Sequence, residues 1–338
     1  MTPEDTLKTP VVLLIFKRPQ TTQLVFEAVR RARPPVLLIV SNQPPADKAD
    51  QLLQCQQARA IVEAVDWPCE VFRNYADTYM SCKDRIVSGL NWVFETVEQA
   101  IILEDDCVPE PSFFGYCQEL LQHYATDQRI MAITGDNFTI PPRQAQYSYS
   151  FSRYTHFWGW ATWRRAWQHY DADMGLWPEF RQADWLSDIL PDPAAVRWWD
   201  KTLQQTYAGQ KDTWDYQWIF STWVQGAHCI VPRVNLVTNL GFGVDAAHNR
   251  DEFDWRAKLP TQTIELPLHH PPVIRADAQC DRILQSRYYG YIAQKQSRPL
   301  PYRIRRKLHR AKLLIQQHRA HEGSEPLIKL IRRILKEN

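Results

Sequence analysis

Residues 100–106 read Ala100-Ile101-Ile102-Leu103-Glu104-Asp105-Asp106, so that four apolar residues run directly into three carboxylates. An apolar run of this length predicts a strand buried on both faces, as in a parallel sheet covered by helices. Three adjacent carboxylates repel one another, so their position is costly unless a cation lies beside them. Mg²⁺ or Mn²⁺ is the natural partner and would share its charge with a diphosphate. Taken alone, such an acidic cluster is more often a solvated strand end.

Similar apolar runs alternate with amphipathic stretches on both sides of this segment. Strands are predicted at 11–16, 36–40, 70–73, 100–103 and 130–134, and helices at 19–32, 47–65, 81–98 and 112–124. The alternation predicts an α/β fold with a doubly wound, mostly parallel sheet and helices on both faces. Ligands of such sheets bind beyond the carboxyl ends of the strands. Polar residues gather at those ends: Lys17-Arg18, Ser41-Asn42, Glu104-Asp105-Asp106 and Asp136-Asn137.

Three cations lie near these predicted strand and helix ends. Arg18 follows the first strand, and Lys83 and Arg85 follow a helix start predicted at Ser81. Each could pair with a diphosphate, although a single cation of this kind is more often a surface charge. The sequence has no G-x-x-x-x-G-K-[ST] loop, which excludes the P-loop manner of holding phosphates.

The second half of the chain is rich in aromatic residues and contains three segments that could carry chemistry. Asp215 lies near the start of a helix predicted over 212–226, where it would act as a general base or simply be favoured by the helix dipole. The pair Gly159-Trp160 could stack on a sugar or belong to a packed aromatic layer. The loop 241–248 could close over a ligand and let His248 complete a metal shell, although a lone His is more often structural.

Composition narrows the class of protein. Apolar residues make up 44% of the chain, which is enough for a substantial core. The seven cysteines are an odd number without a C-x-x-C pair, which argues against a disulfide framework or a zinc site. The N-terminus lacks a secretory signal pattern, and no apolar run reaches the roughly 18 residues of a membrane-spanning helix. A cytoplasmic protein is therefore expected.

Charge is unevenly distributed along the chain. Residues 301–338 carry 11 Lys and Arg against 3 Asp and Glu, a net charge of +8, whereas residues 1–300 carry 29 against 35, a net charge of −6. The basic character belongs to the tail, so no nucleic-acid partner is predicted. Apolar residues at helical spacing within the tail predict an amphipathic helix. That helix would lie on the inner face of a membrane as a peripheral contact or dock on the preceding domain.

Taken in order, these motifs resemble those of the GT-A glycosyltransferases, in particular the N-acetylglucosaminyltransferase type I family and related bacterial glycosyltransferases. The resemblance covers roughly residues 10–254. It rests on Leu103–Asp106 with Pro111–Tyr116, on Gly159-Trp160 with Trp167 and Trp177-Pro178, on Trp214–Trp218, and on Phe242-Gly243 to His248. Two positions depart from the family pattern. Tyr216 stands where the family has a second acid. Asn42-Gln43 stand where it has an Asp that contacts the uracil, although an amide can also pair with a base edge.

The resemblance implies a GT-A fold, a UDP-sugar donor, Mn²⁺ or Mg²⁺, and inversion at the anomeric carbon. Within the triplet, Asp106 would bind the metal together with His248, Asp105 would approach the ribose, and Glu104 would approach the sugar. Asp215 would deprotonate the hydroxyl group of a glycan or of a lipid-linked acceptor.

The expected activity is that of a hexosyl- or N-acetylhexosaminyl-transferase. The expected organisation is a GT-A domain over 1–255 (donor half about 10–140, acceptor half about 141–255), an extension over 256–296 and a basic helical tail over 297–338. Two alternatives remain. A sugar nucleotidyltransferase would share the sheet but usually has a glycine-rich loop after the first strand, where Phe16-Lys17-Arg18-Pro19 has no glycine. A non-catalytic membrane-surface or interaction protein is suggested by the tail.

Overall fold

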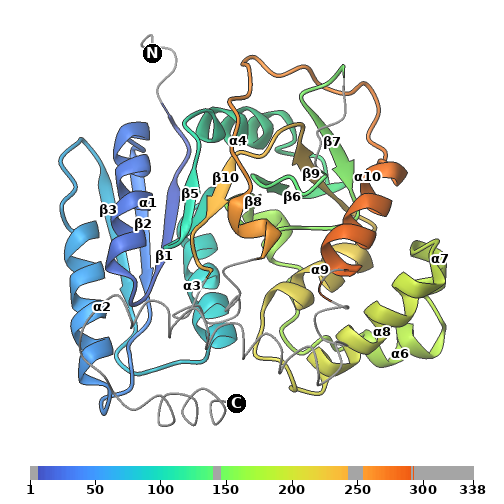
Figure 1. The fold of residues 1–338 in the computed structure, drawn as a ribbon, viewed down its shortest axis with the longest axis horizontal. Coiled ribbons are helices and arrows are strands. Elements are labelled where there is room, and N and C mark those ends of the chain that lie inside the picture. The colour runs from blue at the N-terminus through green and yellow to red at the C-terminus, as the bar shows by residue number, and fades with distance from the viewer. Residues whose placement is uncertain (1–6, 140–145, 243–253, 291, 293–338) are drawn as a thin grey trace, which may run out of the picture. The chain divides into compact units, whose positions relative to one another are not determined.

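The structure is a computed structural model that describes residues 7–139, 146–242, 254–290 and 292. The chain divides into two compact units, residues 1–285 and 286–338. The first unit contains the elements that matter below, and Figure 1 shows its strands between the helices. The predicted tail over 297–338 and the metal ligand His248 both lie outside the described residues.

An eight-stranded sheet forms the centre of the first unit, in the order β3-β2-β1-β4-β8-β6-β9-β7. Its strands are β1 (Val11–Ile15), β2 (Val36–Ser41), β3 (Glu70–Tyr75), β4 (Gln99–Glu104), β6 (Ile130–Thr134), β7 (Tyr149–Ser152), β8 (Trp160–Trp163) and β9 (His228–Pro232). β8 is antiparallel to its neighbours β4 and β6, and β7 is antiparallel to β9. The other neighbouring pairs are parallel. The expectation of a mostly parallel α/β sheet is confirmed.

The helices follow the strands closely in the first half of the chain. They are α1 (Pro19–Ala32), α2 (Ala49–Val62), α3 (Cys82–Thr96), α4 (Ser112–His123), α5 (Arg164–Trp167), α6 (Trp177–Gln182), α7 (Leu186–Ile189), α8 (Pro193–Tyr207), α9 (Asp215–Val224) and α10 (Ala278–Ile283). The order of the sheet reverses after β3, so right-handed crossovers place α1 and α2 on one face and α3 on the other. The described chain has no helix long and apolar enough to cross a membrane.

Local sequence explains where the main helices begin. α1 starts at Pro19, whose missing N–H costs nothing in a first helical turn. The predicted N-cap Ser81 is confirmed, because its side chain accepts a hydrogen bond from the Asp84 N–H (3.1 Å). Asp192 caps α8 in the same way.

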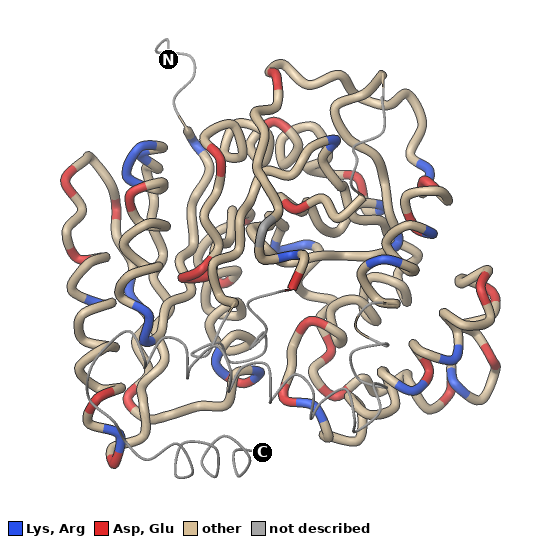
Figure 2. The backbone as a smooth tube through the Cα atoms, viewed as in Figure 1, with Lys and Arg blue, Asp and Glu red and all other residues tan. Residues whose placement is uncertain are grey.

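The core lies on both faces of the sheet. Every residue of β1 and β6 is buried, as are the four apolar residues that precede the acidic triplet in β4. In Figure 2 these central strands are tan, whereas blue and red segments occur on the outer helices and at the ends of strands. Burial on both faces explains the uninterrupted apolar runs, because an alternating pattern would place polar side chains in one of the two layers.

A second, two-stranded sheet lies immediately after the triplet. β5 (Cys107–Pro109) pairs antiparallel with β10 (Val237–Asn239). The pairing extends to the triplet itself, since the Leu240 N–H donates to the Asp106 carbonyl (2.7 Å). The last described residues before position 243 are thereby held beside Asp106. The described part of 256–296 contacts α4 and β7, for example through hydrogen bonds from the N–H groups of Leu268 and Asp277 to Glu119 and to the Phe151 carbonyl, respectively.

Candidate active site at the switch point of the sheet

The strand order reverses between β1 and β4, which lie side by side in parallel. The chain leaves β1 toward β2 on one side, whereas β4 lies on the other side. The carboxyl ends of these two strands therefore mark the switch point of the sheet, the position at which ligands bind in open α/β proteins. Leu14 is in register with Glu104, and the Asp105 N–H donates to the Leu14 carbonyl (3.0 Å). The residues after the two strands therefore meet at this edge.

Arg18 and the acidic triplet contact each other directly. Arg18 Nη1 lies 3.0 Å from Asp105 Oδ1 and 2.6 Å from Asp106 Oδ2. Asp105 and Asp106 are only 4% and 5% exposed, whereas the Arg18 side chain is 28% exposed. Burial by itself would lower the pKa of Arg18, but the charges of Asp105 and Asp106 outweigh it and raise the pKa above its ordinary value. Arg18 therefore keeps its positive charge in this contact.

One guanidinium does not neutralise three acids. Burial, together with the charges of Asp106 and Asp105, raises the pKa of Glu104 to about 8. Burial and the charge of Asp106 raise the pKa of Asp105 to about 6, even though Arg18 and the Phe16 N–H (2.9 Å) both favour its charged form. These two shifts have the same electrostatic origin. The cluster holds more negative charge than its protein partners balance.

The chemistry of the donors fits a divalent cation in part. Asp105 and Asp106 offer hard oxygen atoms that already hold one cation, the Arg18 guanidinium. Gly241 packs against this pair so closely that a Cβ atom there would lie 2.0 Å from Asp106 Oδ2. Within the described ranges no group of three or more His, Cys, Asp or Glu side chains is arranged as a metal centre. Any ion bound here would need further ligands from a bound molecule, from water or from residues outside the described ranges, among them the expected ligand His248.

Asp215 is the first residue of α9. Its Oδ1 accepts hydrogen bonds from the Thr213 hydroxyl and from the Tyr216 N–H (2.9 Å). Oδ2 makes no hydrogen bond to a described residue. Its charge reaches the triplet, because Asp215 contributes to the raised pKa of Glu104. The predicted base and the predicted donor-side acids therefore belong to one neighbourhood.

Cys82, at the first position of α3, lies between the two groups of acids. Burial raises the pKa of its thiol to about 12, with further contributions from Glu104, Asp212 and Asp215. Asp212 is held at the same place, since its carboxylate accepts hydrogen bonds from the N–H groups of Cys82 (3.2 Å) and Lys83 (3.1 Å). Sequence reasoning did not single out Asp212. Its partners lie 129 and 130 residues away, and no local pattern marks it as a cap.

The remaining predicted cations have other partners in this structure. Lys83 Nζ donates to the Ala172 carbonyl (3.1 Å). Arg85 is buried and donates to the Asn74 carbonyl and side chain (both 2.7 Å) and to the Ser88 hydroxyl (3.0 Å). Of the three cations that we expected at a diphosphate, Arg18 alone is paired with the acidic triplet.

Asn42 supports the backbone instead of presenting a free amide. Its Nδ2 donates to the Met80 carbonyl (2.9 Å), and its Oδ1 accepts from the N–H groups of Gln43 and Met80 (2.9 and 3.2 Å). The amide that was expected to pair with a base edge thus ties the end of β2 to the segment before α3.

Trp160 belongs to the packed aromatic layer, the second of the two interpretations given above. Its ring is fully buried in β8 and stacks on Trp214 at a centroid distance of 5.5 Å. Trp214 immediately precedes Asp215, so the layer supports the start of α9. Gly159 has a φ of +62°, and a Cβ there would lie 2.8 Å from Val237 and 3.2 Å from Leu103. Close packing between strands and the positive φ therefore explain why a glycine occupies position 159.

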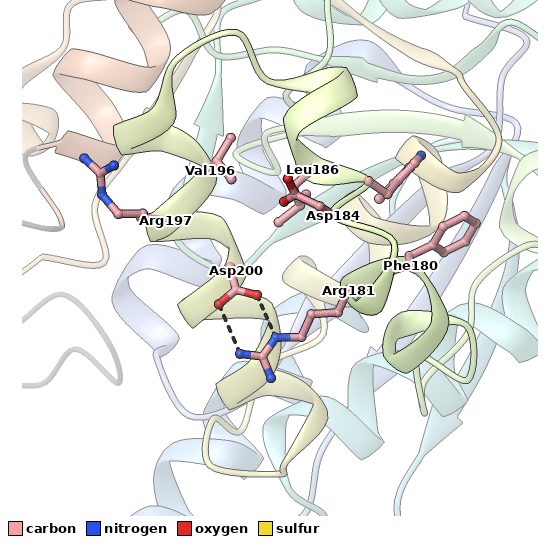
Figure 3. Close-up of a pocket in the computed structure, with 8 residues that line it drawn as sticks. Phe180, Arg181, Asp184, Leu186, Val196, Arg197 and Asp200 are labelled. Carbon is pink, nitrogen blue, oxygen red and sulfur yellow. Dashed lines mark hydrogen bonds and ion pairs between the residues drawn. The ribbon is translucent and has the colours of Figure 1, made fainter.

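A separate pocket of about 220 Å³ lies among α6, α7 and α8. Figure 3 shows Arg181 and Asp200 joined across it. Its lining residues are Phe180, Arg181, Asp184, Trp185, Leu186, Val196, Arg197 and Asp200. It contains none of the residues that sequence analysis connected with chemistry.

Similarity to known proteins is found among solved structures. No family model matches the chain, and no curated protein matches it. Among solved structures, UDP-glucose pyrophosphorylase complexed with UDP-glucose is similar at 14% identity over 38% of this chain and 57% of that chain, with a TM-score of 0.24. This chain therefore spans less than two thirds of that protein. The 4-diphosphocytidyl-2C-methyl-D-erythritol synthase of Anaerococcus prevotii is similar at 10% identity over 47% and 72%, with a TM-score of 0.26. Apo mouse xyloside xylosyltransferase 1 is similar at 12% identity over 63% and 81%, with a TM-score of 0.32. Similarities at this level carry no argument about activity.

Proposed function

We propose that the chain is a glycosyltransferase that moves a sugar from a nucleotide-diphosphate donor, a UDP-sugar, to a hydroxyl group of a glycan or of a lipid-linked acceptor. The single observation that supports this most is the buried, incompletely neutralised carboxylate cluster at the switch point, within electrostatic reach of Asp215. A cluster of this kind suits a site that receives a cation together with a polyanionic ligand.

The proposed roles are those that the resemblance to GT-A glycosyltransferases implies. Asp106 would hold a divalent metal ion, Asp105 would approach the ribose, and Glu104 would approach the transferred sugar. When bound, Mn²⁺ or Mg²⁺ would supply positive charge that stabilises the departing diphosphate. Arg18 is the cation that contacts Asp105 and Asp106.

Asp215 is the proposed general base. Its carboxylate would take the proton of the acceptor hydroxyl while the acceptor oxygen bonds to the anomeric carbon. The bond from that carbon to the diphosphate oxygen would break at the same time, releasing the nucleoside diphosphate with inversion. Thr213 and the Tyr216 N–H hold one oxygen of Asp215 and leave the other for this proton.

Titration calorimetry with UDP and Mn²⁺ tests the proposal. The wild-type chain should bind UDP only with Mn²⁺ present, and Asp106→Ala should abolish binding. Asp188→Ala removes an exposed acid on α7 and serves as the control, with binding expected at the wild-type level. No heat of binding for any nucleoside diphosphate or UDP-sugar, in wild-type protein that melts cooperatively, would refute the proposal.

A further inference from the structure

The backbone of Arg18 is fixed, whereas its side chain reaches solvent. The Arg18 carbonyl accepts hydrogen bonds from the N–H (2.9 Å) and hydroxyl (2.8 Å) of Thr22, and from the Thr21 hydroxyl (3.3 Å). These contacts anchor the residue at the first turn of α1. The side chain is 28% exposed and is held on the carboxylates through Nη1 alone. Its Nε and Nη2 make no hydrogen bond to a described residue. A rotation about side-chain bonds is therefore enough to move the guanidinium.

In their charged form, Asp105 and Asp106 are stabilised by a cation beside them. The two side chains are only 6% and 7% exposed, and an uncompensated buried charge is strongly destabilising. Arg18 is this cation in the present structure, with Nη1 2.6 Å from Asp106 Oδ2. A divalent ion binds carboxylate oxygen at roughly 2.0–2.2 Å. It would occupy the space that Nη1 now occupies, and the two positive charges would repel each other. The two cations are therefore alternatives.

Once a divalent ion has displaced it from the carboxylates, the Arg18 guanidinium could bind a phosphate group. A guanidinium presents its N–H groups in a planar fork that suits phosphate oxygen atoms, and the fork would be free once Nη1 leaves the carboxylates. Because α1 anchors the Arg18 backbone, the guanidinium would remain close to the carboxyl ends of β1 and β4. Gly241 packs against Asp106 Oδ2 and leaves the acid itself little room to move.

We propose that Arg18 is an exchangeable counter-ion: it occupies the Asp105–Asp106 pair while no divalent cation is bound, and after displacement by that cation it donates to the diphosphate of the donor. The second half of this proposal rests on the proposed function. The first half, the exchange of cations, stands without it.

The exchange is tested by titrating the full chain with Mn²⁺ alone, without nucleotide. Arg18→Gln should bind Mn²⁺ roughly ten- to hundredfold more tightly than wild type, the range covered by one or two charge-assisted hydrogen bonds. Arg18→Lys keeps a competing cation and should stay close to wild type. Arg31→Gln removes an exposed charge from the same helix and should have no effect. Unchanged or weaker Mn²⁺ binding by folded Arg18→Gln would overturn the exchange.

The second half is tested by titrating UDP into protein saturated with Mn²⁺. Arg18→Gln should now bind UDP at least about tenfold more weakly than wild type, so that one substitution raises one affinity and lowers the other. Loss of both affinities would identify Arg18 as a purely structural residue and overturn the proposal. If Arg18→Gln gains Mn²⁺ affinity but no variant binds any nucleotide, the exchange holds, whereas the diphosphate contact and the proposed function both fail.

Discussion

Gly241 offers a sharp perturbation of the site, because one added methyl group would collide with Asp106. A Cβ atom at position 241 would lie 2.0 Å from Asp106 Oδ2, 2.8 Å from Asp106 Cγ and 3.1 Å from Asn239 Oδ1. Ordinary van der Waals contact begins at about 3.4 Å, so Gly241→Ala requires a displacement of more than about 1 Å. The Asp106 carboxylate cannot yield freely, since it is buried and paired with Arg18.

Overpacking of this kind costs about 1–3 kcal/mol. At about 2–4 °C for each kcal/mol in a domain of this size, Gly241→Ala should lower the Tm by several degrees in a calorimetric scan. The displacement also moves Asp106, the proposed metal ligand, out of its present position. Mn²⁺-dependent UDP binding should therefore weaken by about tenfold or more, which titration calorimetry measures.

Gly175→Ala is the matched control. Its added Cβ would meet only Asp171 Oδ2, at an ordinary 3.5 Å, and its backbone is not in the left-handed region. Any general gain from the lower chain entropy of Ala in the unfolded state is about the same in both variants and cancels in the comparison. The reasoning fails if Gly241→Ala melts within about 1 °C of Gly175→Ala and binds Mn²⁺ and UDP equally well.

Three further predictions concern individual carboxylates. Asp215→Asn should slow sugar transfer by about 10²–10⁴ in a donor-consumption assay and leave UDP affinity within about twofold; a parallel loss of affinity would argue against its role as base. Asp212→Ala should lower the free energy of unfolding in urea by about 0.5–2 kcal/mol, because two N–H groups of α3 lose their acceptor. Asp212→Asn keeps a carbonyl oxygen and should recover much of this loss. Equal losses in the two variants would show that the carbonyl acceptor does not matter. Burial raises the pKa of Asp136 well above its usual value, so the native carboxyl keeps its proton while the unfolded one ionises above about pH 4. Wild-type stability should therefore fall as pH rises from about 4 toward the native pKa, by at most about 1.4 kcal/mol per pH unit. In Asp136→Asn the pH-dependent loss of stability should be absent, while the side-chain oxygen still accepts the hydrogen bond from the Trp158 N–H. If the free energy of unfolding of wild type and variant changes with pH at the same slope, the prediction is wrong.

The strands next to the site could be predicted from the sequence because burial on both faces leaves an unambiguous pattern. β1, β2, β4 and β6 each contain four or more consecutive apolar residues, and their order of appearance with intervening helices is enough to expect a parallel sheet. β8 was not expected. Its Trp160-Ala161-Thr162-Trp163 pattern matches a strand no better than an aromatic loop, and its antiparallel insertion between β4 and β6 depends on partners distant in sequence.

The position of the candidate site could be predicted from the sequence, but the partners of its side chains could not. The end of β4 was marked by three carboxylates, and the rule for α/β sheets placed Arg18 near them. The partners of each polar side chain depend on register and on distant loops. The Asn42 amide is hydrogen-bonded to Met80, and the Trp160 ring stacks on Trp214. Asn and Trp side chains are equally suited to contact a ligand. Intrinsic chemistry could not distinguish these outcomes.

The pairing of β5 with β10 has a consequence for biosynthesis. A ribosome that has just delivered Asp106 must add more than a hundred residues before Val237–Asn239 can pair behind it. β4 likewise has an open edge until Trp160–Trp163 emerges, and open edges invite pairing with other chains. The acidic triplet therefore reaches its final surroundings late in translation. Stalled nascent chains of increasing length, treated briefly with protease, would test this. Asp106 should become protected only after β10 has left the exit tunnel.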